Sequence, residues 1–94
     1  MRGYRILASN VRAGGVELDL IVRRGGSLRF CEVKAKEGEA YGDPLEMVGP
    51  AKVARLRRGA EAWLAAHPRE AELDVGFDVV AVRGRRVERV ADAF

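Results

Sequence analysis

The stretch GVELDLIVRRGGSLRFCEVKAK, residues 15–36, constrains the fold more than any other part of the chain. Apolar and charged residues alternate on both sides of a Gly-Gly pair, which is typical of a tight β-hairpin. We therefore expect residues 16–23 and 28–36 to form antiparallel strands. In the first strand, alternation predicts two opposite faces: Val16, Leu18, Leu20 and Val22 on one, and Glu17, Asp19, Ile21 and Arg23 on the other.

The rest of the chain supplies three further strands and one helix. Residues 4–12 are compatible with a first strand, and residues 74–82 are rich in β-branched side chains. Residues 87–94 are expected to form a last edge strand or a tail. Residues 37–49 read as a loop. Pro50–His67 carries an apolar stripe at helical spacing, formed by Val53, Leu56, Ala60 and Leu64.

The order β-β-β-α-β-β indicates an α/β fold. We expect a mixed sheet that contains an antiparallel meander and one main crossover helix. Because a helix connects them, the third and fourth strands should run parallel. The 94 residues are enough for a single domain, residues 1–94.

Composition limits the partners and the compartment. The net charge is +3, which favours an acidic partner such as nucleic acid without establishing one. Arginine predominates over lysine, which suits phosphate recognition but equally follows from a GC-rich genome. Cys31 is the single cysteine, so it has no partner for an intrachain disulfide and is expected to be a buried small hydrophobe. Since neither a secretory signal nor a membrane span is recognisable, we expect a cytoplasmic protein.

Charged residues interrupt the apolar pattern of the hairpin. Glu32 and Lys34 lie two apart and share a strand face, and Asp19 is expected to approach Glu32 from the paired strand. Two close carboxylates repel unless a cation lies between them, and a divalent ion such as Mg²⁺ is a natural one. The alternative is an ordinary solvated sheet face with cross-strand acid–base pairs. An apolar end next to the charged end, marked by Phe30 and Ile21, favours a site at the margin of a core.

These motifs resemble those of a known family. GGVELDLIV followed by LRFCEVKAK is similar to the Asp…Glu-x-Lys core of the PD-(D/E)xK nuclease superfamily. Within it the chain resembles the YraN-like family, described as Holliday-junction-resolvase-like. The matching positions run through the hairpin, the following loop, the helix and the last strand: Gly15, Glu17, Asp19, Ile21, Phe30, Glu32, Lys34, 41–46, Lys52, Leu56, Ala60, 77–80 and 93–94.

The resemblance implies a restriction-endonuclease-like core with a metal-dependent phosphodiesterase site. Asp19 and Glu32 are expected to bind Mg²⁺, with Mn²⁺ as a possible substitute, together with the backbone carbonyl of Val33. Lys34 is expected to orient the attacking water and offset charge in the transition state. Lys52 resembles the auxiliary residue that such nucleases place near the phosphate. Glu17 either binds the metal through water or faces solvent.

The expected partner is DNA, with branched or structured DNA as the candidate substrate, and a homodimer would suit symmetric junctions. Arg55, Arg58, Tyr41 and Lys36 are the residues expected to contact nucleic acid. Members of the family typically begin with a helix that carries an acid. The segment matching GYRIL lies next to Met1, so we expect that helix and its acid to be missing. Two alternatives to an enzyme remain open: a non-catalytic nucleic-acid-binding module that keeps the nuclease fold, and a protein-interaction domain.

Overall fold

A computed structural model describes residues 3–35 and 49–94 of the chain. These residues form five strands and one α-helix in the predicted order, together with a short 3-10 helix that was not predicted. In chain order these are β1 (Arg5–Ala13), β2 (Val16–Arg24), β3 (Ser27–Ala35), α1 (Pro50–Ala66), η2 (Glu70–Glu72), β4 (Asp74–Arg83) and β5 (Arg86–Val90).

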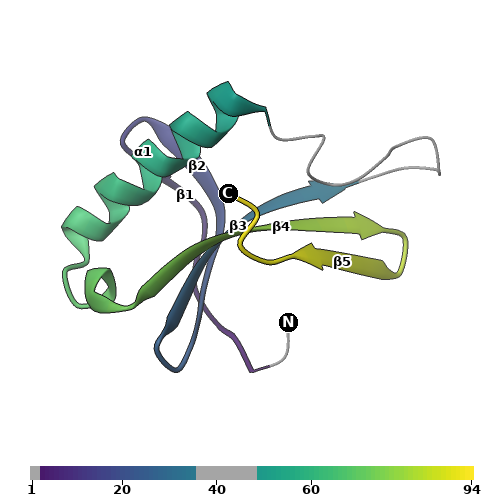
Figure 1. Cartoon of the computed structure of the whole chain (residues 1–94), viewed down its shortest axis with the longest axis horizontal. Coiled ribbons are helices and arrows are strands. Elements are labelled where there is room, and N and C mark those ends of the chain that lie inside the picture. Colours follow the sequence, from purple (N-terminus) through teal and green to yellow (C-terminus); the bar gives the residue numbers. More distant parts are fainter. Residues whose placement is uncertain (1–2, 36–48) are drawn as a thin grey trace.

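The five strands form one mixed sheet in the order β1-β2-β3-β4-β5. β1, β2 and β3 make the predicted antiparallel meander, and β4 pairs antiparallel with β5. β3 and β4 run parallel, in a register from Ser27 opposite Asp74 to Ala35 opposite Val82. Figure 1 shows α1 lying across one face of the sheet, close to β1 and β2, with β5 on the far side of β4. The predicted α/β class, with one main helix after three strands, is confirmed.

Helix α1 begins where the sequence indicates. Gly49 precedes it in extended conformation, and Pro50 occupies the first turn, where its missing N–H costs nothing. The helix buries Leu56, Ala60 and Trp63 against the sheet. Gly59 is also buried, and it packs so closely on β2 that an added β-carbon would lie 3.0 Å from Cβ of Val16. This close approach brings the helix backbone down onto β2.

The main core lies between α1 and the sheet. Its buried members come from β2, β3 and α1: Leu18, Ile21, Leu28, Phe30, Leu56, Ala60 and Trp63. The ring of Phe30 stands edge-on to Trp63, with centroids 5.8 Å apart, and stacks on Phe77 at 5.6 Å. A smaller cluster on the opposite face contains Val22, Cys31 and Val80. Cys31 is therefore buried, as predicted.

The strand faces of β2 differ from the prediction. Leu18 belongs to the helix-side core together with Ile21, whereas Leu20 packs on the opposite face with Val22. Residues three apart on a regular strand point to opposite faces, so alternation breaks between Leu18 and Ile21. The predicted common face for Leu18 and Leu20 is thus wrong. Simple alternation assumes an undistorted strand, and β2 is distorted around Asp19.

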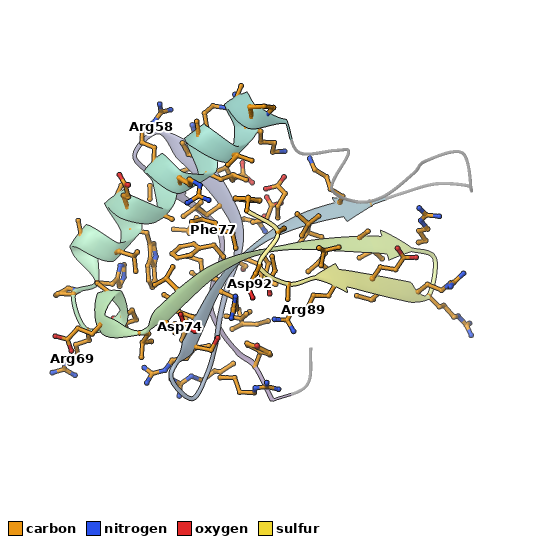
Figure 2. The ribbon with its side chains drawn as sticks, in the orientation of Figure 1. Arg58, Arg69, Asp74, Phe77, Arg89 and Asp92 are labelled. Atoms are coloured by element: carbon orange, nitrogen blue, oxygen red, sulfur yellow. The ribbon has the colours of Figure 1, made fainter. Side chains whose placement is uncertain are left out.

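The opposite face of the sheet buries a charge that the sequence analysis did not predict. Asp78 on β4 is fully buried, and its carboxylate accepts hydrogen bonds from Arg89 on β5, at 2.8 Å, and from the backbone N–H of Asp92, at 3.0 Å. Arg29 on β3 bridges Asp78 and Asp92. In Figure 2, Arg89 and Asp92 lie on the side of β4 away from the helix. Every acceptor of this buried carboxylate is therefore in contact with a donor.

The residues after β5 fold back over the sheet. The backbone N–H of Ala93 donates to the carbonyl of Phe77 at 2.7 Å, and the ring of Phe94 stacks on that of Phe77 with centroids 5.0 Å apart. This segment is the predicted tail, and it reaches the helix side of the sheet. Within residues 3–35 and 49–94, α1 and η2 are both too short or too polar to cross a lipid bilayer.

Candidate functional site

Asp19 lies at the point where β2 parts from β3. The paired residues of the two strands end at Leu20 opposite Cys31. One step further, Oδ2 of Asp19 accepts a hydrogen bond from the backbone N–H of Val33 at 3.0 Å. A side-chain carboxylate thus takes the position that a backbone carbonyl of β2 would hold in a continuous ladder. This contact brings the Asp19 carboxylate beside the strand that carries Glu32.

Glu32 carries the second carboxylate, and it is almost completely buried, with 6 % of the residue exposed. Its Oε1 atom lies 3.2 Å from Nζ of Lys34, on the same strand, and 2.6 Å from Nζ of Lys52, on the first turn of α1. A buried carboxylate is costly unless it is paired and hydrogen-bonded. Two ammonium groups on one oxygen meet that requirement and tie the helix start to the sheet.

The electrostatics of the site keep Lys52 charged. Partial burial lowers the pKa of its ammonium group, but the hydrogen bond to Glu32 and the charges of Glu32 and Asp19 outweigh burial, so the pKa is raised. A lysine with a raised pKa stays protonated at neutral pH and cannot accept a proton. Lys52 is therefore a fixed cation that can bind an anionic group.

Asp19 and Glu32 line the same small pocket. Most of its wall is apolar and comes from three strands, the helix and the tail after β5: Leu18, Leu20, Phe30, Cys31, Leu56, Phe77 and Phe94. The guanidinium of Arg57 lies over the rings of Phe77, at 5.3 Å, and Phe94, at 5.8 Å. Figure 2 shows Phe77 between the helix and the sheet. The closing Ala-Phe of the sequence was matched to the family pattern, but no periodicity indicated that Phe94 reaches this pocket.

The other residues singled out from the sequence are more dispersed. Glu17 is exposed and lines a separate shallow depression with Lys52, Arg55 and Arg58. Arg58 points away from the sheet in Figure 2. Lys36 and Tyr41, the remaining candidates for nucleic-acid contact, lie outside the described residues.

The donor set can be tested against the expected metal. Among residues 3–35 and 49–94, no group of three or more His, Cys, Asp or Glu side chains is positioned to hold a metal ion. Asp19 and Glu32 nevertheless offer hard carboxylate oxygens to one pocket, and Mg²⁺ commonly binds through one or two carboxylates while keeping several waters. In donor chemistry, the two carboxylates therefore fit a hydrated Mg²⁺ ion. They do not fit a metal that needs an all-protein cage.

The thiol of Cys31 is held in its neutral form. Burial and, to a smaller extent, the charge of Asp78 raise its pKa to about 12, although Arg89 and Arg29 act in the opposite sense. Because the thiolate is the reactive form, we expect iodoacetamide at pH 8 to label the native protein far more slowly than the protein in denaturing urea. Mass spectrometry of quenched samples measures both rates, and equal rates would contradict the burial of this thiol.

The raised pKa of Cys31 also determines whether the free energy of unfolding rises or falls with pH. The unfolded thiol loses its proton above about pH 8.5, whereas the folded thiol keeps it until about pH 12. Between these values the native state binds more protons, so the free energy of unfolding falls as pH rises. The raised pKa of Lys52 acts in the same direction. Replacing Cys31 with Ala should flatten part of this decline in urea titrations at successive pH values.

The fold and the site together define a small α/β protein in which two carboxylates and two lysines converge at the start of a crossover helix. Residues 1–82 match the family described as "Uncharacterised protein family UPF0102". The chain belongs to this family, and the predicted YraN-like membership is confirmed.

Relatives in three bacteria show how far the similarity extends. The UPF0102 protein Francci3_3586 of Frankia casuarinae is 46% identical over 97 residues, covering 98% of this chain and 81% of the relative. A UPF0102 protein of Acidothermus cellulolyticus is 42% identical over 107 residues, covering 98% and 80%. The UPF0102 protein YraN of Escherichia coli is 39% identical over 94 residues, covering 99% and 72%. The similarity therefore includes both strands of the hairpin and the start of α1.

Proposed function

We propose that this protein is a Mg²⁺-dependent endonuclease that hydrolyses phosphodiester bonds in structured or branched DNA. One observation carries the proposal: Glu32 is buried, is bonded to Lys34 and Lys52, and shares a pocket with Asp19. Carboxylates can hold a metal ion that polarises a phosphoryl oxygen, and adjacent lysines can offset the negative charge of the transition state. Neither a surface salt bridge nor core packing needs a second carboxylate in the same pocket.

Each side chain has a part in the proposed reaction. Asp19 and Glu32 bind the metal ion, which when present supplies Lewis-acid stabilisation of charge on the scissile phosphate. Lys34 orients the water whose oxygen attacks phosphorus, and its positive charge offsets the charge that develops in the transition state. Lys52 stays protonated and binds a phosphate oxygen. Hydrolysis forms one P–O bond to the water oxygen and breaks the P–O bond to the leaving oxygen, which takes up a proton.

The surroundings of the pocket suit a polyanion. Arg55 and Arg58 lie on α1 next to Lys52 and line the adjacent depression. Contacts of such residues with phosphates release counterions, so binding should weaken as salt increases. We propose that branched DNA lies along this end of α1, that a homodimer acts on symmetric junctions, and that the protein acts in the cytoplasm, where bacterial DNA is found.

A second function is favoured by one specific observation. Oε1 of Glu32 is already neutralised by two ammonium groups, and a third acid is lacking among residues 3–35 and 49–94. A site of this kind is compatible with a non-catalytic module that binds nucleic acid through the same surface. The two functions differ in whether metal ions produce cleavage products.

A metal titration separates them. Fluorescently labelled four-way junctions, nicked duplexes and linear duplexes of equal length are incubated with the protein over a range of Mg²⁺ and Mn²⁺ concentrations. We expect metal-dependent products from the junction, abolished by EDTA. Salt-sensitive binding of the same DNA without products at any metal concentration would reject the enzyme and support the binding module. If the protein neither cleaves nor binds any of these DNA molecules, both proposed functions are rejected.

A further inference from the structure

One residue inside strand β1 has a backbone conformation that strands do not normally contain. Asn10 has φ of 49°, in the left-handed region. The other non-glycine residue with positive φ in the described part of the chain, Asp92, follows the last strand, where a turn is expected. Asn10 is exposed, and it is flanked on both sides by residues paired to β2. Turn formation and packing of its side chain therefore give no reason for this conformation.

The register places this conformation opposite Asp19. Ser9 pairs with Leu20, and Val11 pairs with Leu18, so the rung between them joins Asn10 and Asp19. This is the rung at which both strands lose their alternation. On β2, Leu18 and Ile21 both face the helix-side core, and on β1 their partners Val11 and Ala8 both pack against the same core.

The consequence for Asp19 follows from the ladder. β1 and β2 change face together at this rung, so their mutual pairing continues on both sides of it. The pairing of β2 with β3 instead stops at Leu20, and the Asp19 carboxylate enters the gap to reach the N–H of Val33. A change that straightened β1 would move β2 at this rung and draw the Asp19 carboxylate out of the gap, so that the N–H of Val33 would lose its acceptor.

We propose that Asn10 is a positioning residue whose left-handed backbone holds the Asp19 carboxylate between β2 and β3. The inference deepens the proposed function and rests on it, because it assigns the orientation of one proposed metal ligand to a residue on another strand. Asparagine and glycine adopt the left-handed region readily, whereas β-branched residues do not. Strained backbone that persists inside a regular element is often associated with a functional site.

The test compares substitutions that differ mainly in backbone preference. Asn10→Val opposes the left-handed conformation, Asn10→Gly permits it, and Ser9→Val introduces the same side chain at the neighbouring exposed position, which has ordinary backbone geometry. Should Asn10→Val fail to fold, Asn10→Ala replaces it, because alanine also disfavours positive φ. Thermal unfolding is measured for each variant, so that loss of stability is separated from loss of positioning.

Two measurements are made on the folded proteins. Isothermal titration with Mn²⁺ alone should show about 10- to 100-fold weaker binding for Asn10→Val, as is usual when a group that orients a metal ligand is lost. Asn10→Gly and Ser9→Val should bind as the wild type does. Hydrogen exchange of the Val33 amide, which needs no metal, should accelerate in Asn10→Val and stay slow in Asn10→Gly, because this amide donates to Asp19.

The outcomes separate the two proposals. Slow Val33 exchange in a folded Asn10→Val protein would overturn the positioning role, whatever the metal data show. Absence of Mn²⁺ binding by the wild type would reject the proposed metal-dependent function, while the Val33 exchange rates would still decide the role of Asn10. A lowered melting temperature of Asn10→Val with unchanged Mn²⁺ affinity and unchanged exchange would mean that Asn10 acts only on stability.

Discussion

Replacing Asp19 with Asn is expected to lower metal-dependent cleavage of branched DNA by about 10²–10³-fold or more. The amide has nearly the same shape as the carboxylate and can still accept the hydrogen bond from Val33, but it lacks the negative charge that binds a cation. DNA affinity should be retained or slightly increased, because one negative charge is removed next to a polyanion. Single-turnover cleavage and a binding titration in calcium-free EDTA buffer measure the two effects separately.

A matched control for this result is available on the same sheet. Asp74 is exposed at the start of β4, three residues before Phe77, and Figure 2 shows it on the other side of Phe77 from the start of α1. Asp74→Asn removes the same charge with the same change of shape and should cleave as the wild type does. Cleavage at the wild-type rate by both the Asp19→Asn and the Asp74→Asn proteins would exclude Asp19 from the site. Loss of cleavage in both would point to a general effect of charge.

Replacing Asp78 with Ala is expected to cost about 3–5 kcal/mol of unfolding free energy, the range observed when one member of a buried ion pair is removed. The change leaves the guanidinium of Arg89 without its carboxylate and the N–H of Asp92 without its acceptor. A domain of this size has only about 5–14 kcal/mol of stability in total. Urea unfolding followed by Trp63 fluorescence measures the loss.

The exposed Asp74 again supplies the comparison, since surface substitutions usually change stability by less than about 0.5 kcal/mol. Asp78→Asn keeps one oxygen acceptor and should fall between the wild type and Asp78→Ala. A cost for Asp78→Ala no larger than that of Asp74→Ala would show that the network on this face of the sheet contributes little. Such a result would also mean that the hydrogen bond between Asp92 and Asp78 is not needed to keep Phe94 stacked on Phe77.

The sequence predicted the hairpin and the crossover well, because both follow from local rules. The Gly-Gly pair at residues 25–26 sets the turn, and a helix between β3 and β4 requires the parallel pairing that the structure contains. Spacing also indicated that Glu32 and Lys34 share a face, and the two form an ion pair. These predictions needed only the period of a strand or the handedness of a connection.

Three features could not be predicted in this way. The change of strand face at Asp19 depends on the backbone of Asn10, which lies on a different strand and has no hydrophobic signature. Burial of Asp78 depends on donors from β3, β5 and the tail, whereas its own segment reads as an ordinary apolar strand. The contact of Lys52 with Glu32 links the helix start to β3 across the core, and only the family resemblance indicated it.

The irregular backbone of β1 also affects how the molecule meets its neighbours. β1 is an edge strand of the described sheet, and an exposed edge offers unpaired N–H and C=O groups to other chains. The register of β1 shifts between Ile6 and Ala8, and Asn10 twists the strand again three rungs later. Bulges and twists of this kind interrupt the straight row that a second strand would need. Intermolecular sheet extension and amyloid-like stacking at this edge are thereby disfavoured.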